Sequence, residues 1–257
     1  MTKAARLSLP CIGFALLLVV WQVAGDSLGS AILAPPSQVA GDYVALLRQG
    51  DMLAQLVLSL RQAAIGYVAA CLVGMPVGIA MGRSRLADAI CHPWVSMLVV
   101  TSTAAMIPLL MLFLGTGATL RVVVIFFAVV FYVILATYNG AKSINPNQLA
   151  VGTSFGASRW RIFYSIALPS LYPYLLTAAR IGLVHAVRSM VTVELYIIVG
   201  YGGLIHQTGL STDTGFLLGL LVTLMVTSLA LDAVLRAIGR CVAPWYEQQR
   251  ISTLRIR

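Results

Sequence analysis

A chain of 257 residues that is 60% hydrophobic and only 10% charged is unlike a water-soluble domain, in which about a quarter of the residues carry charge. Its formal net charge of +9 would suit a nucleic-acid binder, but a membrane protein with basic cytoplasmic loops carries the same excess. The composition therefore indicates an all-α polytopic membrane protein, and the placement of the charges decides between the two explanations.

Apolar runs close to the ~20 residues that cross a bilayer recur along the chain. They predict about six transmembrane helices, at Leu9–Ala24, Leu53–Met81, Ala89–Leu114, Val122–Tyr138, Leu171–Val193 and Gly215–Ile238, with a glycine-rich loop, Gly200–Asp213, before the last. After the first run, Pro35 and Pro36 oppose helix formation. We expect Ser37 to cap a short amphipathic segment that ends at Leu47, and the third span to break near Pro108.

Basic residues gather on one side of these spans. With a cytoplasmic N-terminus, the inner side receives about a dozen of them: Lys3, Arg6, Arg83, Arg85, Lys142, Arg159, Arg161, Arg236, Arg240, Arg250, Arg255 and Arg257. The outer side receives two basic residues and four aspartates: Arg48, Arg121, Asp26, Asp42, Asp51 and Asp213. This asymmetry follows the positive-inside rule, so we predict that both termini are cytoplasmic and that no nucleic acid is bound.

No motif for catalysis or for nucleotide binding occurs in the chain. It has no phosphate-binding glycine loop, no nucleophile elbow and no HExxH. The four cysteines have no CxxC spacing and no neighbouring histidines: Cys11, Cys71, Cys91 and Cys241. We expect no enzyme activity, metal or cofactor in this chain. It also shows no repeat typical of secondary transporters, so uphill transport would need energy from a partner.

The stretch Gly152–Pro169 falls on the predicted cytoplasmic side, between the fourth and fifth spans. A turn at Ile144–Gln148 precedes a short helix, Gly156 is expected to end that helix, and Ser158 to cap the next one. Pro169 is expected to interrupt the start of the fifth span. Such a helix–turn–helix suits the docking of another protein, although an ordinary interfacial loop has the same features.

Basic and aromatic residues alternate after this turn. Arg159 and Arg161 are expected to extend their charged ends to the membrane surface, while Trp160 and Phe163 lie in the interface. The stretch is therefore predicted to lie on the inner face of the membrane.

The spacing of this stretch resembles the coupling motif of permease subunits of bacterial ATP-binding cassette importers. Gly156 is followed, after nine residues, by Ile-x-Leu-Pro at 166–169, as in that motif. The motif usually begins with Glu-Ala-Ala, where this chain has Ala-Val-Gly. The resemblance implies that coupling to an ATPase involves the following residues: Ala150, Val151, Gly152, Phe155, Gly156, Ala157, Ser158, Arg159 and Trp160.

Further motifs resemble the nitrate/sulfonate/taurine-type permeases. They are Pro-Pro-Ser at 35–37, Ser-Leu-Arg at 59–61, which is similar to the SLxR of the family, GxPxGxxxGxS at 74–84 and IPLLxLxxGxG at 107–117. The resemblance implies a type I importer permease fold in the bacterial inner membrane, as one domain over 1–257, with a core bundle at about 53–245 and a coupling region at 145–169. It also implies a second permease copy (homodimer, or heterodimer with a related permease), two ATPase subunits that hold ATP and Mg, and an external solute-binding protein.

Two groups of polar residues lie within the apolar spans, where ionisable side chains are costly. Arg61, Arg180 and Glu194 stand where the family usually has the same residues, and we expect them to fix the bundle by pairing with each other or with backbone. Candidates for a translocation path form the second group: Thr101, Ser102, Thr103, His185, Arg188 and Thr192.

The last three of these candidates share one helical face by their i, i+3, i+7 spacing. Such a basic stripe would suit a crossing anion, but Arg188 could equally extend to the outer interface and His185 could be a packed histidine. The hydroxyls at 101–103 would line the path or allow close helix packing.

These patterns favour a permease that forms a path by alternating access for a small anionic solute, such as a sulfonate, nitrate or carboxylate. Two alternatives stay open: a membrane scaffold or sensor that docks an ATPase without transport, and a permease for a heterocyclic vitamin or pyrimidine precursor.

Overall fold

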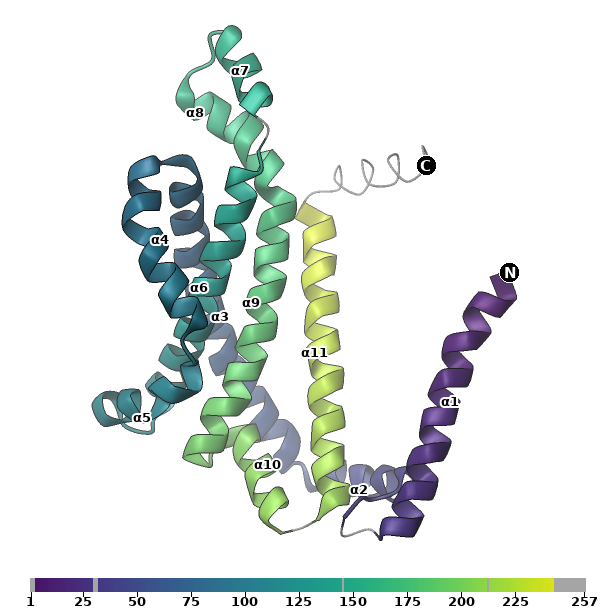
Figure 1. Ribbon diagram of the computed structural model, residues 1–257. Coiled ribbons are helices and arrows are strands. Elements are labelled where there is room, and N and C mark those ends of the chain that lie inside the picture. The colour runs from purple at the N-terminus through teal and green to yellow at the C-terminus, as the bar shows by residue number, and fades with distance from the viewer. Residues whose placement is uncertain (1–2, 30–31, 145, 212, 243–257) are drawn as a thin grey trace. The chain divides into compact units, whose positions relative to one another are not determined.

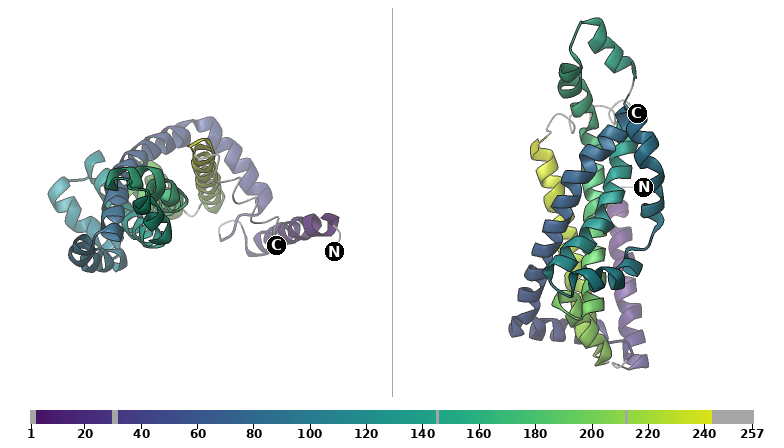
Figure 2. Two further views of the ribbon diagram at one scale, coloured as in Figure 1. Left: turned by 90° about the horizontal axis from the view of Figure 1, so that it is seen from above. Right: turned by 90° about the vertical axis from the view of Figure 1, so that its left-hand side faces the viewer.

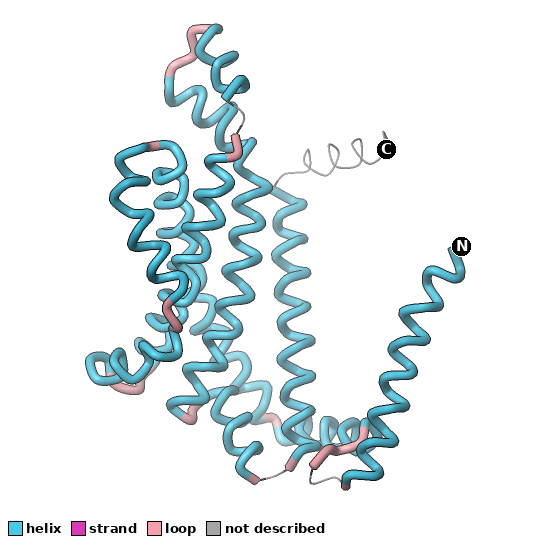
Figure 3. The backbone as a smooth tube through the Cα atoms, viewed as in Figure 1, coloured by secondary structure: helices cyan, strands magenta, loops and turns pink. Residues whose placement is uncertain are grey.

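The structure is a computed structural model that describes residues 3–29, 32–144, 146–211 and 213–242 (Figure 1). Every regular element in these ranges is helical, joined by short loops (Figure 3), which confirms the all-α prediction. The helices are α1 (Lys3–Leu28), α2 (Pro36–Gln49), α3 (Asp51–Arg83), α4 (Arg85–Val100), α5 (Thr103–Leu114), α6 (Ala118–Lys142), α7 (Pro146–Ser154), α8 (Arg159–Ile162), the π-helical turn η1 (Phe163–Ala167), α9 (Leu168–Ile197), α10 (Gly200–Leu210) and α11 (Thr214–Val242).

Within these ranges, four helical stretches are long and apolar enough to cross a membrane: Asp51–Arg83, Ala118–Lys142, Trp160–Ile197 and Thr214–Cys241. A fifth span results if α4 and α5 count as one broken span. The predicted span Leu9–Ala24 lies within α1, which extends over 26 residues, but the side chains of residues 3–11 and 14 lie outside the described part, so this span stays a prediction. The orientation of the termini stays a prediction. Three of the arginines assigned to the cytoplasmic side lie outside the described residues: Arg250, Arg255 and Arg257.

The predicted break in the third span lies at a different place. α4 and α5 bend by 98° at Thr101 and Ser102, while Pro108 lies inside α5. Both bend residues have extended backbones, with ψ of 131° and 115°, and the Thr101 hydroxyl donates to the Met97 carbonyl oxygen at 3.0 Å. Short hydroxyl side chains compete with the helix ladder in this way, whereas the proline removes only one donor from α5.

Two prolines that were expected to oppose helix formation lie at helix starts instead. Pro36 is the first residue of α2, where its missing N–H costs no helical hydrogen bond. Ser37 does not cap this helix; its hydroxyl accepts a hydrogen bond from Gln22 Nε2 at 3.3 Å. Pro169 is the second residue of α9, which continues from η1 without interruption.

The described chain forms two compact units, Met1–Ser59 with Glu194–Thr227, and Leu60–Val193 with Ser228–Arg257. The single-domain prediction over 1–257 stays a prediction, and parts of its subregions, 145 and 243–245, lie outside the described residues. In the first unit, Trp21 Nε1 donates to the Ala34 carbonyl oxygen at 3.1 Å and ties α1 to the start of α2.

The predicted loop Gly200–Asp213 is largely a helix, α10, in this first unit. A turn before it passes through Ile198 and Gly200, whose φ angles are 54° and 70°. Tyr201 is fully buried and its hydroxyl donates to the Leu220 carbonyl oxygen at 2.6 Å. Burial raises the pKa of Tyr201 to about 12, so the phenol stays a donor at neutral pH.

The core of the second unit surrounds α6, which lies side by side with α3 and α9 (Figure 2). Glycines on α3 permit this approach: a Cβ on Gly74 would lie 3.0 Å from a Val133 methyl, and one on Gly78 would lie 2.6 Å from the Ile134 carbonyl oxygen. On the other side, Gly182 of α9 faces the same Val133. Small residues thus bring three helices together, as in many membrane bundles.

Candidate functional site

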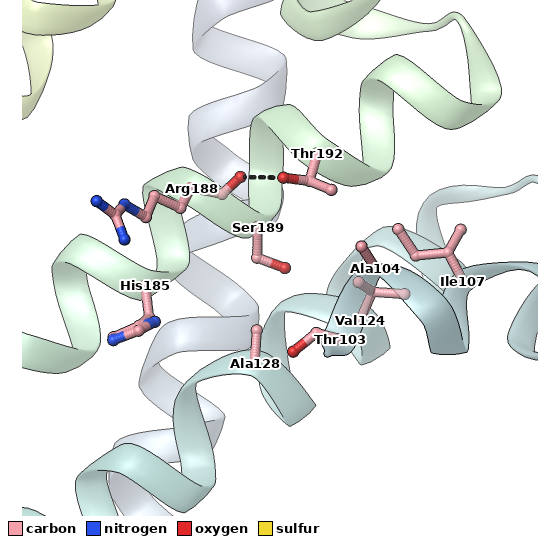
Figure 4. A pocket seen from close by; sticks show the side chains of 9 residues that line it. All are labelled: Thr103, Ala104, Ile107, Val124, Ala128, His185, Arg188, Ser189 and Thr192. Carbon is pink, nitrogen blue, oxygen red and sulfur yellow. Dashed lines mark hydrogen bonds between the residues drawn. The ribbon is translucent and has the colours of Figure 1, made fainter. Parts of the chain in front are cut away.

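A cavity of about 130 Å³ lies between α5, α6 and α9 in the second unit (Figure 4). It is lined by Thr103, Ala104, Ile107, Val124, Ala128, His185, Arg188, Ser189 and Thr192. Four of the six predicted path residues therefore meet at one cavity: Thr103, His185, Arg188 and Thr192. Thr101 and Ser102 do not line it, because they form the bend that precedes α5.

The polar side chains of α9 have different environments. The His185 ring stacks on Tyr132, with ring centroids 3.6 Å apart and planes 15° from parallel. Thr192 Oγ1 donates to the Arg188 carbonyl oxygen at 2.9 Å. The Arg188 side chain is exposed, and in Figure 4 its guanidinium extends away from Thr103, at the edge of the cavity. His185 is thus a packed ring, whereas Arg188 carries an accessible cation.

Sequence patterns did not single out Ser189, whose buried side chain lies on the cavity side of α9 in Figure 4. It lies four residues after His185, so the i, i+4 spacing of a helix places it on the same face, and this spacing could have identified it. The 98° bend that brings α5 to the cavity is invisible to periodicity.

The intramembrane arginine Arg180 has a different partner from the ones predicted. Its Nε and Nη2 donate to Asp232 Oδ1 and Oδ2 at 2.8 and 3.3 Å, which joins α9 to α11. Arg236 Nη1 lies 3.0 Å from the same carboxylate. Asp232 is the one acidic residue of α11 and lies four residues before Arg236 in a largely apolar helix, and this pattern could have identified it.

Glu194 agrees with the prediction of a backbone partner. Its Oε2 accepts a hydrogen bond from the Gly202 N–H at 2.9 Å, and Ser59 Oγ accepts one from the Tyr201 N–H at 3.0 Å. The two side chains therefore cap the N-terminus of α10. Arg61 is exposed and makes no ion pair within the described part of the chain.

The coupling region forms the predicted helix–turn–helix. α7 ends at Ser154, Gly156 has φ of 69°, and the Ala157 N–H donates to the Gly152 carbonyl oxygen at 3.1 Å, a common helix C-cap. Ser158 caps α8 by accepting a hydrogen bond from the Arg161 N–H at 3.4 Å. The side chain of Arg159 and residue 145 lie outside the described part.

Glycine at position 152 allows α7 to approach the second arm of the hairpin, which consists of α8 and η1. A Cβ there would lie 2.8 Å from Ile166 Cδ1 and 3.1 Å from Ile162 Cγ1. The base of this arm is anchored by the buried Ala167 and Leu171, which cluster with Ala141 of α6. The departure from Glu-Ala-Ala therefore has a packing reason at its third position.

The coupling hairpin carries exposed apolar side chains. Val151 of α7 and Phe155 of the following turn are 54% and 86% exposed; we call them the tip surface. Trp160 of α8 is 73% exposed and lines a hollow together with residues of α3. Ala150 is also exposed, while Ala157 is half-buried. An exposed aromatic group of this kind is typical of an interaction site.

Known proteins are similar to this chain in sequence and in fold. Residues 74–248 match the family model of the binding-protein-dependent transport system inner membrane component. A probable ABC transporter permease protein of Brucella abortus (strain 2308) is 30% identical, covering 96% of this chain and 98% of the relative. The taurine transport system permease protein TauC of Escherichia coli (strain K12) is 31% identical, covering 90% and 86%.

Among solved structures, an inward-facing form of the MetNI methionine ABC transporter is similar, with a TM-score of 0.61 and 20% identity, covering 77% of this chain and 95% of that one. This likeness supports the importer-permease fold. The family match spans about two thirds of the sequence, and the chain therefore belongs to the binding-protein-dependent inner membrane components, the permease subunits of ATP-binding cassette importers.

Proposed function

We propose that this permease carries a small anionic solute across the bacterial inner membrane by alternating access, with both termini cytoplasmic. The observation that carries the proposal is the exposed Arg188 guanidinium at the edge of the cavity between α5, α6 and α9. No carboxylate occurs among the nine residues that line this cavity.

Arg188 belongs to a span, where an ionisable side chain is costly and is a candidate for function. It makes no ion pair with the described acidic residues. Guanidinium binds sulfonate, carboxylate and other oxyanions through charge-assisted hydrogen bonds, and Ser189 and Thr103 offer hydroxyl donors nearby. The Escherichia coli relative is named for taurine, which carries a sulfonate.

The partners follow from the same proposal. The tip surface of Val151 and Phe155 docks an ATPase subunit, and this subunit holds the ATP and Mg that drive transport. Two permease copies, identical or related, form the path, and an external solute-binding protein delivers the cargo. ATPase closure would draw the two coupling hairpins together and switch the side on which the path opens.

Uptake by proteoliposomes tests the proposal. The full assembly, with its binding protein, is reconstituted and supplied with labelled taurine or nitrate. Arg188→Gln should lower uptake about tenfold or more, because one charge-assisted contact in a site of low dielectric is worth ~1.5–3 kcal/mol. Arg188→Lys should retain part of the uptake. Arg61→Gln is the matched control, since it removes an exposed intramembrane arginine that does not line the cavity.

Equal uptake by wild type and Arg188→Gln would contradict the anion path. If wild type and Arg188→Gln take up an uncharged heterocycle at the same rate, the vitamin or pyrimidine-precursor alternative would be favoured. If an ATPase subunit co-purifies but the binding protein stimulates neither ATP hydrolysis nor uptake, the scaffold alternative would replace transport. If no ATPase subunit co-purifies and no hydrolysis is stimulated, the importer proposal fails.

A further inference from the structure

A second and larger hollow lies in the same unit, separate from the cavity of Arg188. It is a groove of about 960 Å³ between the end of α3 and the coupling hairpin. Pro76, Ile79 and Arg83 line it from α3, and Trp160 and Phe163 line it from the hairpin. This volume lies near the upper end of the ~300–1,000 Å³ typical of ligand sites.

The walls of the groove are apolar, with one cation. Arg83 is exposed and is the single charged residue among the residues that line the groove. The one hydroxyl there belongs to Thr153 and donates to the Ala150 carbonyl oxygen at 2.7 Å, so it is already used within α7. An occupant would therefore bury apolar surface and place one negative group on Arg83.

The groove lies where a spanning helix ends. α3 extends from Asp51 to Arg83, so the groove follows its last two turns and its cation is the final residue. Next to it, Trp160 and Tyr164 are 73% and 59% exposed, and their rings stack with centroids 6.1 Å apart. Exposed aromatic residues at the ends of spans are typical of the membrane interface.

We propose that the groove binds one anionic phospholipid, with an acyl chain along Ile79 and Phe163 and the phosphate on Arg83. An occupant that complements this lining is apolar over most of its surface and carries one negative group, which describes this class of lipid and is unlike the mixed surface of a protein partner. A lipid bound there bridges α3 and the coupling hairpin, and so ties the hairpin's position to the membrane.

Native mass spectrometry of the purified full-length assembly tests the site without any transport substrate. After incubation in nanodiscs of equal parts phosphatidylglycerol and phosphatidylcholine, each wild-type permease should retain phosphatidylglycerol. Arg83→Gln should lower this retention about fivefold, the effect of one basic residue on anionic lipid. Arg85→Gln is the matched control, because it removes an exposed cation two residues later that does not line the groove.

A pair of bulky substitutions tests whether lipid binding depends on the groove itself as well as on the charge of Arg83. Ala80→Trp fills the groove and keeps Arg83, and it should also reduce retention, whereas Ala64→Trp adds the same bulk at an exposed α3 position outside it. Gel filtration confirms that each variant is assembled. Glycerol phosphate, which has no acyl chain, should not compete.

Three results would overturn the proposal: equal retention in Arg83→Gln and Arg85→Gln, equal retention of phosphatidylcholine, or full competition by glycerol phosphate. If an ATPase subunit covers the groove instead, neither the wild-type assembly nor either variant will carry a lipid adduct. That result would also overturn the proposal.

Discussion

Arg180 and Asp232 join α9 to α11 through two hydrogen bonds, from Nε to Oδ1 at 2.8 Å and from Nη2 to Oδ2 at 3.3 Å. The carboxylate also contacts Arg236, one turn further along α11. Both helices belong to stretches that are apolar enough to cross a membrane, so few other polar partners compete for these charges. The pair is therefore a specific link between two spans.

We predict that removing either partner loosens this link. The side chains of Arg180 and Asp232 are 45% and 26% exposed, so their coupling should resemble that of interhelical polar pairs in membranes, about 1 kcal/mol. A double-mutant cycle with Arg180→Ala and Asp232→Ala, followed by unfolding in mixed micelles, measures it. The Arg236→Ala cycle should give less, because that pair lies within one helix. Coupling near zero for Arg180 would contradict the prediction.

Sequence patterns located the spans better than their connections. An apolar run of span length is a bulk property, so α3, α6, α9 and α11 were all expected. The bend at Thr101 and the helix α10 were not, because they depend on single backbone choices and on acceptors from distant segments. Ser59, for example, caps a helix that begins 141 residues later, at Gly200.

Part of the candidate site could also be predicted from the sequence, and part could not. The shared face of His185, Arg188 and Thr192 follows from helical spacing alone, and the structure places all three at one cavity. Their meeting with Thr103 depends on the bend between α4 and α5, which no local pattern encodes. In the coupling region, the turn at Gly156 was predictable because glycine readily adopts a positive φ.

Close packing between α3 and α6 predicts a sharp contrast between two glycines. A Cβ on Gly78 would lie 2.6 Å from the Ile134 carbonyl oxygen and 2.7 Å from Thr137 Cβ, whereas one on Gly41 would meet nothing within 4 Å. Gly78→Ala should lower the free energy of unfolding by about 1–3 kcal/mol. Gly41→Ala should raise it by up to about 1 kcal/mol, because alanine favours the helix. Thermal unfolding in detergent compares them, and equal effects would contradict the packing.

The cap of α10 predicts a local effect of Glu194. Its carboxylate is 1% exposed and accepts the Gly202 N–H, so Glu194→Ala should leave a buried donor unpaired and cost about 1–3 kcal/mol. Glu194→Gln keeps an acceptor oxygen and should cost less. Hydrogen exchange provides the readout: amides of α10 should exchange faster in Glu194→Ala, while those of α6 stay protected. Uniform acceleration in both helices would indicate global unfolding instead.

The tip surface predicts a variant that assembles poorly but folds normally. Phe155 is 86% exposed, so Phe155→Ser should leave the unfolding midpoint unchanged. If this ring is an anchor for the ATPase subunit, its loss should weaken association about thirtyfold or more, since anchor residues contribute ~2 kcal/mol or more. Co-purification and titration with the ATPase subunit measure the loss.

Phe113→Ser is the matched control for this variant, because it removes the same ring from a similarly exposed position, 75%, on α5. ATPase affinity should be unchanged in that control. A second variant, Ala150→Glu, restores an acid at the first position of the motif and should leave the fold intact, because that side chain is exposed. If Phe155→Ser binds the ATPase as tightly as wild type and Ala150→Glu binds it much more tightly, the contact depends on charge, and the apolar tip is not its anchor.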